Sequence, residues 1–236
     1  MIHSSTGYAA HAPAKDVSDV MRSRRTVRAF RDQPVARELI EEVLRDAAAA
    51  PSGANMQPWR VYVVAGTVKD MLCAAVLAAA RGGKGLPPAH LPEPLPEVFR
   101  SRMADFGARY YRSLGIERSD VQARAGQTER NYFFFGAPVG LIFSIDRRLK
   151  PHSWIDLGLF AQGLMLSAKA RGLDTCPQVS FAPFHEAISS VLGMPSEEVT
   201  VFGMSLGYGD LNAAVNRTEM PRQPPESFAR LLGFPT

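Results

Sequence analysis

The stretch from Ser153 to Arg171 restricts the fold most, because as a helix it is apolar on nearly every side. Its large apolar residues are Trp154, Ile155, Leu157, Leu159, Phe160, Leu164, Met165 and Leu166. A helix of this kind lies in a core or in a subunit interface. The Ser153-x-x-Asp156 spacing is typical of a capping box at its start, and Gly172 is a typical stop. The sequence therefore predicts one long, largely covered helix.

Helices and a few strands follow one another without an internal repeat or a break in composition, which favours an α+β fold. We expect helices at 16–23, 35–50, 67–80, 96–115, 118–135, 153–171 and 182–192, and strands at 60–65, 138–145 and 199–206. Thr67, with Asp70 three residues on, is the expected cap of the third helix. Residues 1–15 are expected to form a flexible tail before a single domain at 16–236, with a short helix or arm at 224–232.

Five of the ten residues from Arg22 to Arg31 are arginines. A guanidinium group is a planar fork of N–H donors that matches phosphate oxygens. Arg24, Thr26 and Arg28 are spaced two apart, so in an extended segment they point to the same side. Two guanidinium groups and a hydroxyl can then converge on one phosphate. A solvated basic turn is the alternative that this segment alone leaves open.

A second polar segment, Pro51-Ser52-Gly53-Ala-Asn55-Met-Gln57-Pro58-Trp59, follows about twenty residues later. The amides of Asn55 and Gln57 can both donate and accept, which suits the donor–acceptor edge of a planar ring system. Ser52 and Gly53 allow the backbone to approach a ligand closely. The alternative is a polar loop that ends the preceding helix, and for Trp59 we favour a core position. The two segments together predict a phosphorylated cofactor bound across two loops.

Four motifs in this order resemble the nitroreductase family of FMN-dependent oxidoreductases. They are Arg24–Phe30, Pro51–Trp59, Gly172–Gln178, and Gly207–Asp210 with Asn216, Arg217 and Arg222, and they span roughly residues 18–232. The resemblance implies a three-layer fold in which helices flank a central, mostly antiparallel sheet. It also implies an intertwined homodimer with FMN as cofactor and NADH or NADPH as electron donor.

The resemblance assigns roles to individual residues. It implies that Arg24, Thr26 and Arg28 contact the FMN phosphate and ribityl chain, and that Arg25 contributes mainly backbone. The Asn55 loop reaches the flavin of the partner subunit, and Arg222, in preference to Arg217, returns to the phosphate. The full set of implied cofactor-binding residues is Arg24, Arg25, Thr26, Arg28, Pro51, Ser52, Asn55, Gln57, Pro177, Gln178, Val179 and Arg222.

Backbone donors near the reactive nitrogen tune a flavin. In the segment after Cys176, Pro177 has no N–H, so Gln178, Val179 or Ser180 is the expected donor. Cys176 itself is better read as a small buried residue than as a nucleophile. We therefore expect no catalytic side chain, because the flavin carries the chemistry.

The resemblance implies reduction of a nitroaromatic or quinone acceptor by NAD(P)H in a ping-pong cycle. No Rossmann fingerprint is present, which fits transient stacking of the nicotinamide on the flavin. Other reactions on the same fold remain open at this point: enoate reduction, reductive dehalogenation and flavin fragmentation. An alternative of another class is a flavin-free, basic module that binds nucleic acid, since the net charge is +4. We nevertheless expect no nucleic-acid partner, because the arginines form no long stripe.

Residues 82–130 form a helical excursion that could cover the active site. Among its aromatic residues, Tyr110 and Tyr111 are the candidates for stacking on a small aromatic acceptor. Adjacent positions on a helix point about 100° apart, so only one of the two can readily face a pocket.

The remaining features argue against several classes of site. The five histidines show no metal-ligand spacing, and two cysteines exclude a disulfide framework. Neither a secretory signal nor an apolar run long enough for a membrane span is evident. We therefore expect a cytoplasmic protein with no metal and no membrane partner.

Overall fold

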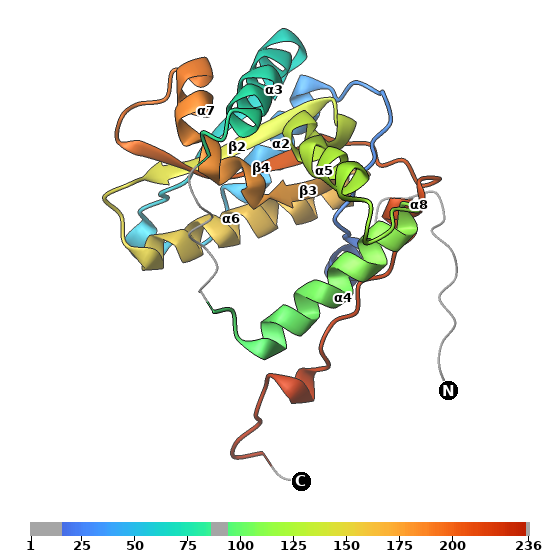
Figure 1. Cartoon of the computed structure of the whole chain (residues 1–236). Helices are drawn as coiled ribbons and strands as arrows, with labels where there is room; N and C mark the ends of the chain where they lie inside the picture. The colour runs from blue at the N-terminus through green and yellow to red at the C-terminus, as the bar shows by residue number, and fades with distance from the viewer. Residues whose placement is uncertain (1–15, 86–93, 235–236) are drawn as a thin grey trace.

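The computed structural model describes residues 16–85 and 94–234, and a four-stranded sheet lies at its centre (Figure 1). The strands are β1 (Arg60–Ala65), β2 (Val139–Asp146), β3 (Asp174–Gln178) and β4 (Glu198–Gly207). Their order is β1-β2-β4-β3, and every neighbouring pair is antiparallel. The flexible tail expected at residues 1–15 lies outside the described residues.

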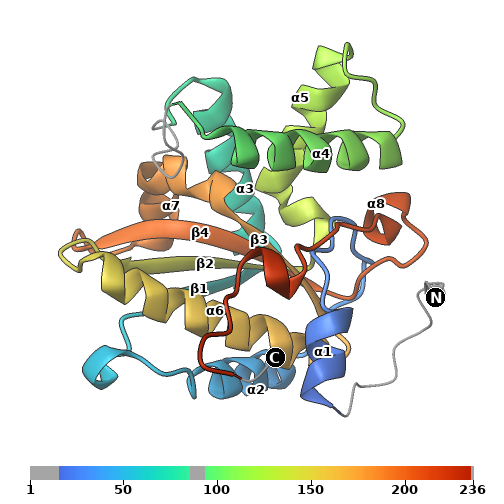
Figure 2. The same cartoon turned by 90° about the horizontal axis from the view of Figure 1, so that it is seen from below.

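Helices cover both faces of the sheet and create three layers (Figure 2). One face carries α2 (Arg37–Ala47) and α6 (Pro151–Ala170), and the other carries α3 (Gly66–Arg81) and α7 (His185–Leu192). Because successive strand residues point to opposite faces, Leu141 of β2 enters the core beneath α6 whereas Ile142 enters the core beneath α3. The α+β, three-layer fold with a mostly antiparallel sheet is confirmed.

The long apolar helix is α6, and it lies between the sheet and α2 (Figure 2). It begins at Pro151, which suits the first helical position because its missing N–H would have no partner there. The capping box expected at Ser153 is therefore wrong, since Ser153 is a buried residue inside the helix. Trp154 and Ile155, in the first turns of α6, are 45% and 61% exposed.

One strand was not predicted, and two other expectations about elements are wrong. Residues 174–178 form β3, which the sequence did not predict because Pro177 cannot donate to a ladder; as an edge strand, β3 tolerates it. α3 begins at Gly66 after Ala65, so Thr67 is not its cap. The helix expected at 118–135 is instead α5 (Val121–Glu129) followed by the 3₁₀ turn η2 (Arg130–Gly136).

The predicted excursion contains α4 (Glu97–Ser113) and α5, which lie together beyond the α3 side of the sheet (Figure 2). α4 also approaches α8 (Ala214–Arg217) near the C-terminus. After α8 the chain forms an arm that extends away from the body, with one 3₁₀ turn, η4 (Pro225–Ser227) (Figure 1). No helix in residues 16–85 and 94–234 is long and apolar enough to cross a membrane.

Candidate functional site

The arginine-rich segment leaves α1 (Val17–Ser23) and runs in an extended conformation along the end of the sheet. Val27 donates its backbone N–H to the carbonyl of Thr175 (3.0 Å), and Arg31 donates to the carbonyl of Tyr208 (2.8 Å). The Val27 side chain is fully buried. Since alternate residues of an extended segment face opposite sides, Thr26 and Arg28 face away from the core.

Asn216 fixes this segment to the C-terminal part of the chain. Its Oδ1 accepts the backbone N–H of Arg28 (2.8 Å), and its Nδ2 donates to the carbonyls of Ala29 and Asp210 (both 2.8 Å). Asn216 is 4% exposed. We did not predict this role from the sequence, although Asn216 lies in the fourth motif. An amide that is both donor and acceptor can replace a strand partner for the backbone.

Most of the predicted phosphate-binding residues line one cleft of about 700 Å³. This arginine cleft is lined by Arg24, Arg25, Thr26, Arg28 and Arg222, and also by Phe106 of α4. Arg217, the less favoured candidate, is not among its lining residues. One chain therefore gathers four predicted arginines and one hydroxyl around a common space.

The charges of the arginine cleft suit an anion. Burial lowers the pKa of the Arg24 guanidinium, and the positive charge of Arg222 lowers it further. Among the described residues, neither Arg24, Arg28 nor Arg222 forms an ion pair with a carboxylate. Glu219 is the acidic residue in the lining of the cleft, and the arginines there outnumber it. Like charges held together in this way are stabilised by a bound phosphate, whose oxygens accept from guanidinium forks. The donor set of the cleft therefore fits the phosphate of FMN.

Arg28 also borders a second space on the α4 side. Its guanidinium carbon lies 5.3 Å from the ring centre of Phe106 and 5.1 Å from that of Tyr110, within the range of cation–π attraction. A cavity of about 220 Å³ opens beside these rings. This aromatic cavity is lined by Arg28, Phe106, Tyr110, Tyr111, Gln127, Thr128, Asn131 and Phe135. Arg28 and Phe106 line both the cleft and the cavity, so the two spaces adjoin.

The two adjacent tyrosines differ as the helix geometry requires. Tyr110 is 8% exposed, and its hydroxyl accepts a hydrogen bond from Gln127 Nε2 (2.7 Å). Burial raises the pKa of Tyr110. Tyr111 is partly exposed and carries the guanidinium of Arg124 over its ring at 3.9 Å. Tyr110 is thus a packed residue, whereas Tyr111 presents a surface to solvent.

The segment predicted to donate a backbone hydrogen bond to the flavin, residues 178–180, lies at the end of β3. Pro177 and Val179 are exposed, while Gln178 is 3% exposed. The Gln178 side chain donates to the carbonyl of Asn131 (2.8 Å) and accepts from Ser205 Oγ (2.7 Å), so its amide is a structural link. The Ser180 hydroxyl is buried without a hydrogen-bond partner among the described residues.

Cys176 has the structural role expected of it. Its side chain is 1% exposed, and burial raises the pKa of its thiol to about 12. The thiolate, which is the reactive form, is therefore absent at neutral pH. Within the described residues, no group of histidine, cysteine and acidic residues could hold a metal ion.

The Pro51–Gln57 loop lies far from the arginine cleft within one chain. Gly53, in the turn η1 (Gly53–Asn55), donates to Asp156 Oδ2 (3.2 Å) near the start of α6. The arginine segment pairs with Thr175, just beyond the end of the same helix. Figure 2 shows α1 and the turn before β1 near opposite ends of α6. A helix of this length spans about 30 Å, so one subunit does not bring the two motifs together.

The exposed conformation of this loop is consistent with a contact outside its own chain. Ala54, Asn55 and Gln57 have positive φ values of 49°, 56° and 48°. Such a backbone is unfavourable for residues other than glycine and is often found where strain serves a site. Gln57 donates its N–H to Ser52 Oγ (3.0 Å) and its side-chain amide to Asn55 Oδ1 (3.0 Å). These bonds hold the polar side chains of the loop in one exposed group.

Known proteins resemble the chain over nearly its whole length. The model of the nitroreductase family matches residues 21–208. A 4-nitrobenzoate reductase of Pseudomonas putida is 46% identical over 93% of this chain and 96% of its own length, and a nitrobenzene nitroreductase of Ectopseudomonas oleovorans is 41% identical over 92% and 96%. The crystal structure of the FMN and NADPH-dependent nitroreductase NfnB from Sphigopyxis sp. strain HMH superposes with a TM-score of 0.90 at 35% identity, covering 93% of this chain and all of that one.

Proposed function

The chain belongs to the nitroreductase family, and on that basis we propose the reaction and the roles of its residues. It is an FMN-dependent oxidoreductase that uses NAD(P)H to reduce nitroaromatic acceptors. FMN, when bound, supplies the redox chemistry that carries electrons from the nicotinamide to the acceptor. Quinones belong to the same proposal as further acceptors, and the nicotinamide and the acceptor use the site in turn.

A single observation carries this function: Arg28 borders both the arginine cleft and the aromatic cavity. The phosphate of FMN needs the arginine cleft, and the planar rings that take part in the reaction need the aromatic cavity. Arg24, Arg25, Thr26 and Arg222 would hold the phosphate, with Arg28 between the phosphate and the ring. Tyr111 would border the acceptor, while Tyr110 would hold the wall of the cavity in place. No side chain is needed as a proton donor at the redox centre.

We extend the proposal to the loops that border the ring. The exposed backbone after Pro177, chiefly Gln178 and Val179, would donate hydrogen bonds to the flavin. Pro51, Ser52, Asn55 and Gln57 would reach the flavin of a second subunit. The separation of the Asn55 loop from the arginine cleft in one chain supports this arrangement, because both motifs otherwise could not serve one cofactor.

The same geometry supports an intertwined homodimer. Trp154, Ile155 and Leu159 of α6 are 45%, 61% and 43% exposed, which is unusual for a helix packed along a sheet. The C-terminal arm adds Phe228 and Leu232, 73% and 82% exposed. Burying these surfaces between two copies removes apolar area from water, at roughly 25 cal/mol per Å².

Residues 16–236 act in this proposal as one domain, since two cores share one sheet. We place the protein in the cytoplasm, where NAD(P)H is available and where the two free, buried cysteines remain reduced.

Purification and heat release of the cofactor test the proposal directly. We expect FMN, and the loaded protein should oxidise NAD(P)H only when a nitroaromatic acceptor or another oxidant is present. Acceptors of the related reactions, an enoate and a halogenated phenol, are the comparison. FAD, absence of flavin after reconstitution with FMN, or turnover of the comparison acceptors alone would overturn it.

A further inference from the structure

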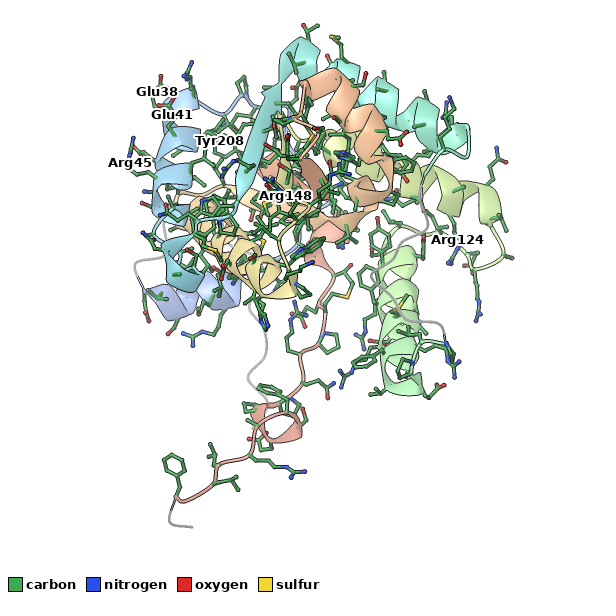
Figure 3. All side chains as sticks on the ribbon, turned by 90° about the vertical axis from the view of Figure 1, so that its left-hand side faces the viewer. Glu38, Glu41, Arg45, Arg124, Arg148 and Tyr208 are labelled. Atoms are coloured by element: carbon green, nitrogen blue, oxygen red, sulfur yellow. The ribbon has the colours of Figure 1, made fainter. Side chains whose placement is uncertain are left out.

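A third space lies on the far side of Tyr111, in the angle between α4 and α5. It has a volume of about 440 Å³ and is lined among others by Gly107, Tyr111, Arg112, Glu117, Arg118 and Arg124. Tyr111 also lines the aromatic cavity, so this α4–α5 groove is separated from the cavity by one side chain. Figure 3 shows Arg124 between α4 and α5.

The arginines of the α4–α5 groove differ from other arginines of α4. Arg100 and Arg109 form ion pairs with Glu97 and Asp105, one helical turn earlier. Among the described residues, Arg112, Arg118 and Arg124 have no such carboxylate partner. Three guanidinium groups therefore meet at one groove with their charge uncompensated by ion pairs.

Glu117 is the acidic residue among those lining the groove, so the formal charge of its lining is 3 − 1 = +2. That surplus matches a dianion. The guanidinium carbon of Arg124 lies over the Tyr111 ring, 3.9 Å from its centre, and a guanidinium held over an aromatic ring keeps N–H donors at its edge for phosphate oxygens. The groove is larger than a phosphate alone requires. Gly107, which has no side chain, is one of its lining residues, and this leaves room for a flat base.

We propose that the α4–α5 groove binds the adenosine 2′-phosphate end of NADPH and thereby selects NADPH over NADH. This inference rests on the proposed function, which supplies the nicotinamide. The nicotinamide ring lies at the aromatic cavity, and the dinucleotide passes Tyr111 to reach the groove. Phe106 and Arg112 are six residues apart on α4, about 9 Å along its axis, a span that an extended dinucleotide exceeds. Arg112, Arg118 and Arg124 are the specificity-determining residues.

The experiment compares the two nicotinamides on the FMN-loaded protein, for wild type and for Arg112→Gln, Arg118→Gln and Arg124→Gln. We expect wild type to have a higher kcat/KM with NADPH. The ratio of kcat/KM with NADPH to that with NADH should fall about tenfold or more for at least one variant, as loss of a charge-assisted contact predicts. Arg100→Gln is the matched control, because Arg100 is on α4 but does not line the groove.

A binding measurement supplies a second readout. Calorimetric titration with 2′,5′-ADP should show binding to wild type that the affected variant loses, whereas 5′-AMP, which lacks the 2′-phosphate, should bind weakly to both.

Equal use of NADH and NADPH by wild type would overturn the inference, and so would variants with an unchanged ratio of kcat/KM with NADPH to that with NADH. If the variants instead raise KM for 4-nitrobenzoate but not for nitrobenzene, the groove binds an acceptor carboxylate and the 2′-phosphate assignment is wrong. Nitroreduction with NADH alone would leave the proposed function standing, while a protein without flavin would refute the proposed function itself.

Discussion

Asn216 accepts a hydrogen bond from the backbone N–H of Arg28 across 188 residues of sequence. The same amide donates to the carbonyls of Ala29 and Asp210. Asn216 thus holds the arginine segment to the chain that follows β4, and Arg222 lies on that same C-terminal segment. The arginine cleft is assembled from two distant parts of the sequence, and one buried side chain joins them.

Replacing Asn216 by alanine tests this joint. The change removes three hydrogen bonds at a buried position, and each unsatisfied group costs about 1–3 kcal/mol. We expect the melting temperature to fall by several degrees and the FMN affinity to fall about tenfold or more, as measured by thermal unfolding and fluorescence titration. Asn216→Asp keeps the acceptor for the Arg28 N–H, so its melting temperature and FMN affinity should lie between those of wild type and Asn216→Ala. Asn212→Ala is the control, since that residue is exposed nearby; an equal effect of both alanine variants would argue against a specific joint.

Arg28→Ala should weaken FMN binding while the fold is retained. A charged hydrogen bond contributes about 1.5–3 kcal/mol, which corresponds to about tenfold or more in affinity. Arg28→Lys should be intermediate, because lysine keeps the charge but lacks the planar fork that stacks on Phe106 and Tyr110. Arg31→Ala serves as control, since Arg31 does not line the cleft. An unchanged FMN titration for Arg28→Ala would remove Arg28 from the cofactor site.

Tyr110 and Tyr111 should respond differently to substitution. Tyr110→Ala leaves a hole in a packed region and deprives Gln127 of its partner, so it should lower stability by about 3–5 kcal/mol. Tyr111→Ala should retain most stability and FMN but raise KM for the aromatic acceptor. Urea unfolding and stopped-flow measurement of reoxidation by acceptor separate the two effects. A Tyr111→Ala protein with an unaltered acceptor half-reaction would place the acceptor elsewhere.

His185 predicts a dependence of stability on pH. The backbone N–H of Thr200 bonds to its Nδ1 (3.2 Å), and the guanidinium of Arg147 lies 3.3 Å from its Nε2. Burial lowers the pKa of His185 below the ordinary value of 6.5, Arg147 lowers it further, and Glu186 and Glu198 oppose the shift. The unfolded chain therefore binds this proton at a higher pH than the folded protein does. Stability is retained above the unfolded pKa and is lost as pH falls below it.

Urea unfolding at about pH 7.5 and about pH 5.5 measures this loss. His185→Gln removes the titrating group, so the difference in free energy of unfolding between the two pH values should shrink in that variant. His152→Gln, at an exposed position near the start of α6, should leave the difference as in wild type. The same difference in His185→Gln as in wild type would mean that other groups cause the acid sensitivity.

The sequence predicted this protein best where pattern alone determines structure. Local sequence patterns predicted the apolar helix α6 and the strands β1, β2 and β4, and the folded structure contains them. The alternate spacing of Arg24, Thr26 and Arg28 is a local pattern of the same kind. β3 was missed because Pro177 weakens the local strand pattern, and only its pairing with β4 creates the strand. The linking role of Asn216 was not predicted for the same reason, since only the assembled fold brings its three hydrogen-bond partners together. The α4–α5 groove likewise depends on how two helices meet, which no single segment encodes.

A shared site can be tested by mixing subunits with different lesions. If Arg28 of one subunit and Asn55 of its partner serve the same flavin, a heterodimer of Arg28→Ala and Asn55→Ala chains has one site with both lesions and one intact site. Random pairing makes about half of the dimers mixed, so co-expression should recover about a quarter of wild-type activity, whereas each variant alone has little.

Co-expression of Arg28→Ala with Arg222→Ala is the matched control. Both side chains line the same cleft of one chain, so every site of that heterodimer carries a lesion and no activity should return. The contrast between the two pairs separates subunit sharing from simple stabilisation by co-expression. Equal recovery in both pairs, or none in the first pair although mixed dimers form, would show that the Asn55 loop and the arginine cleft do not complete one site across the interface.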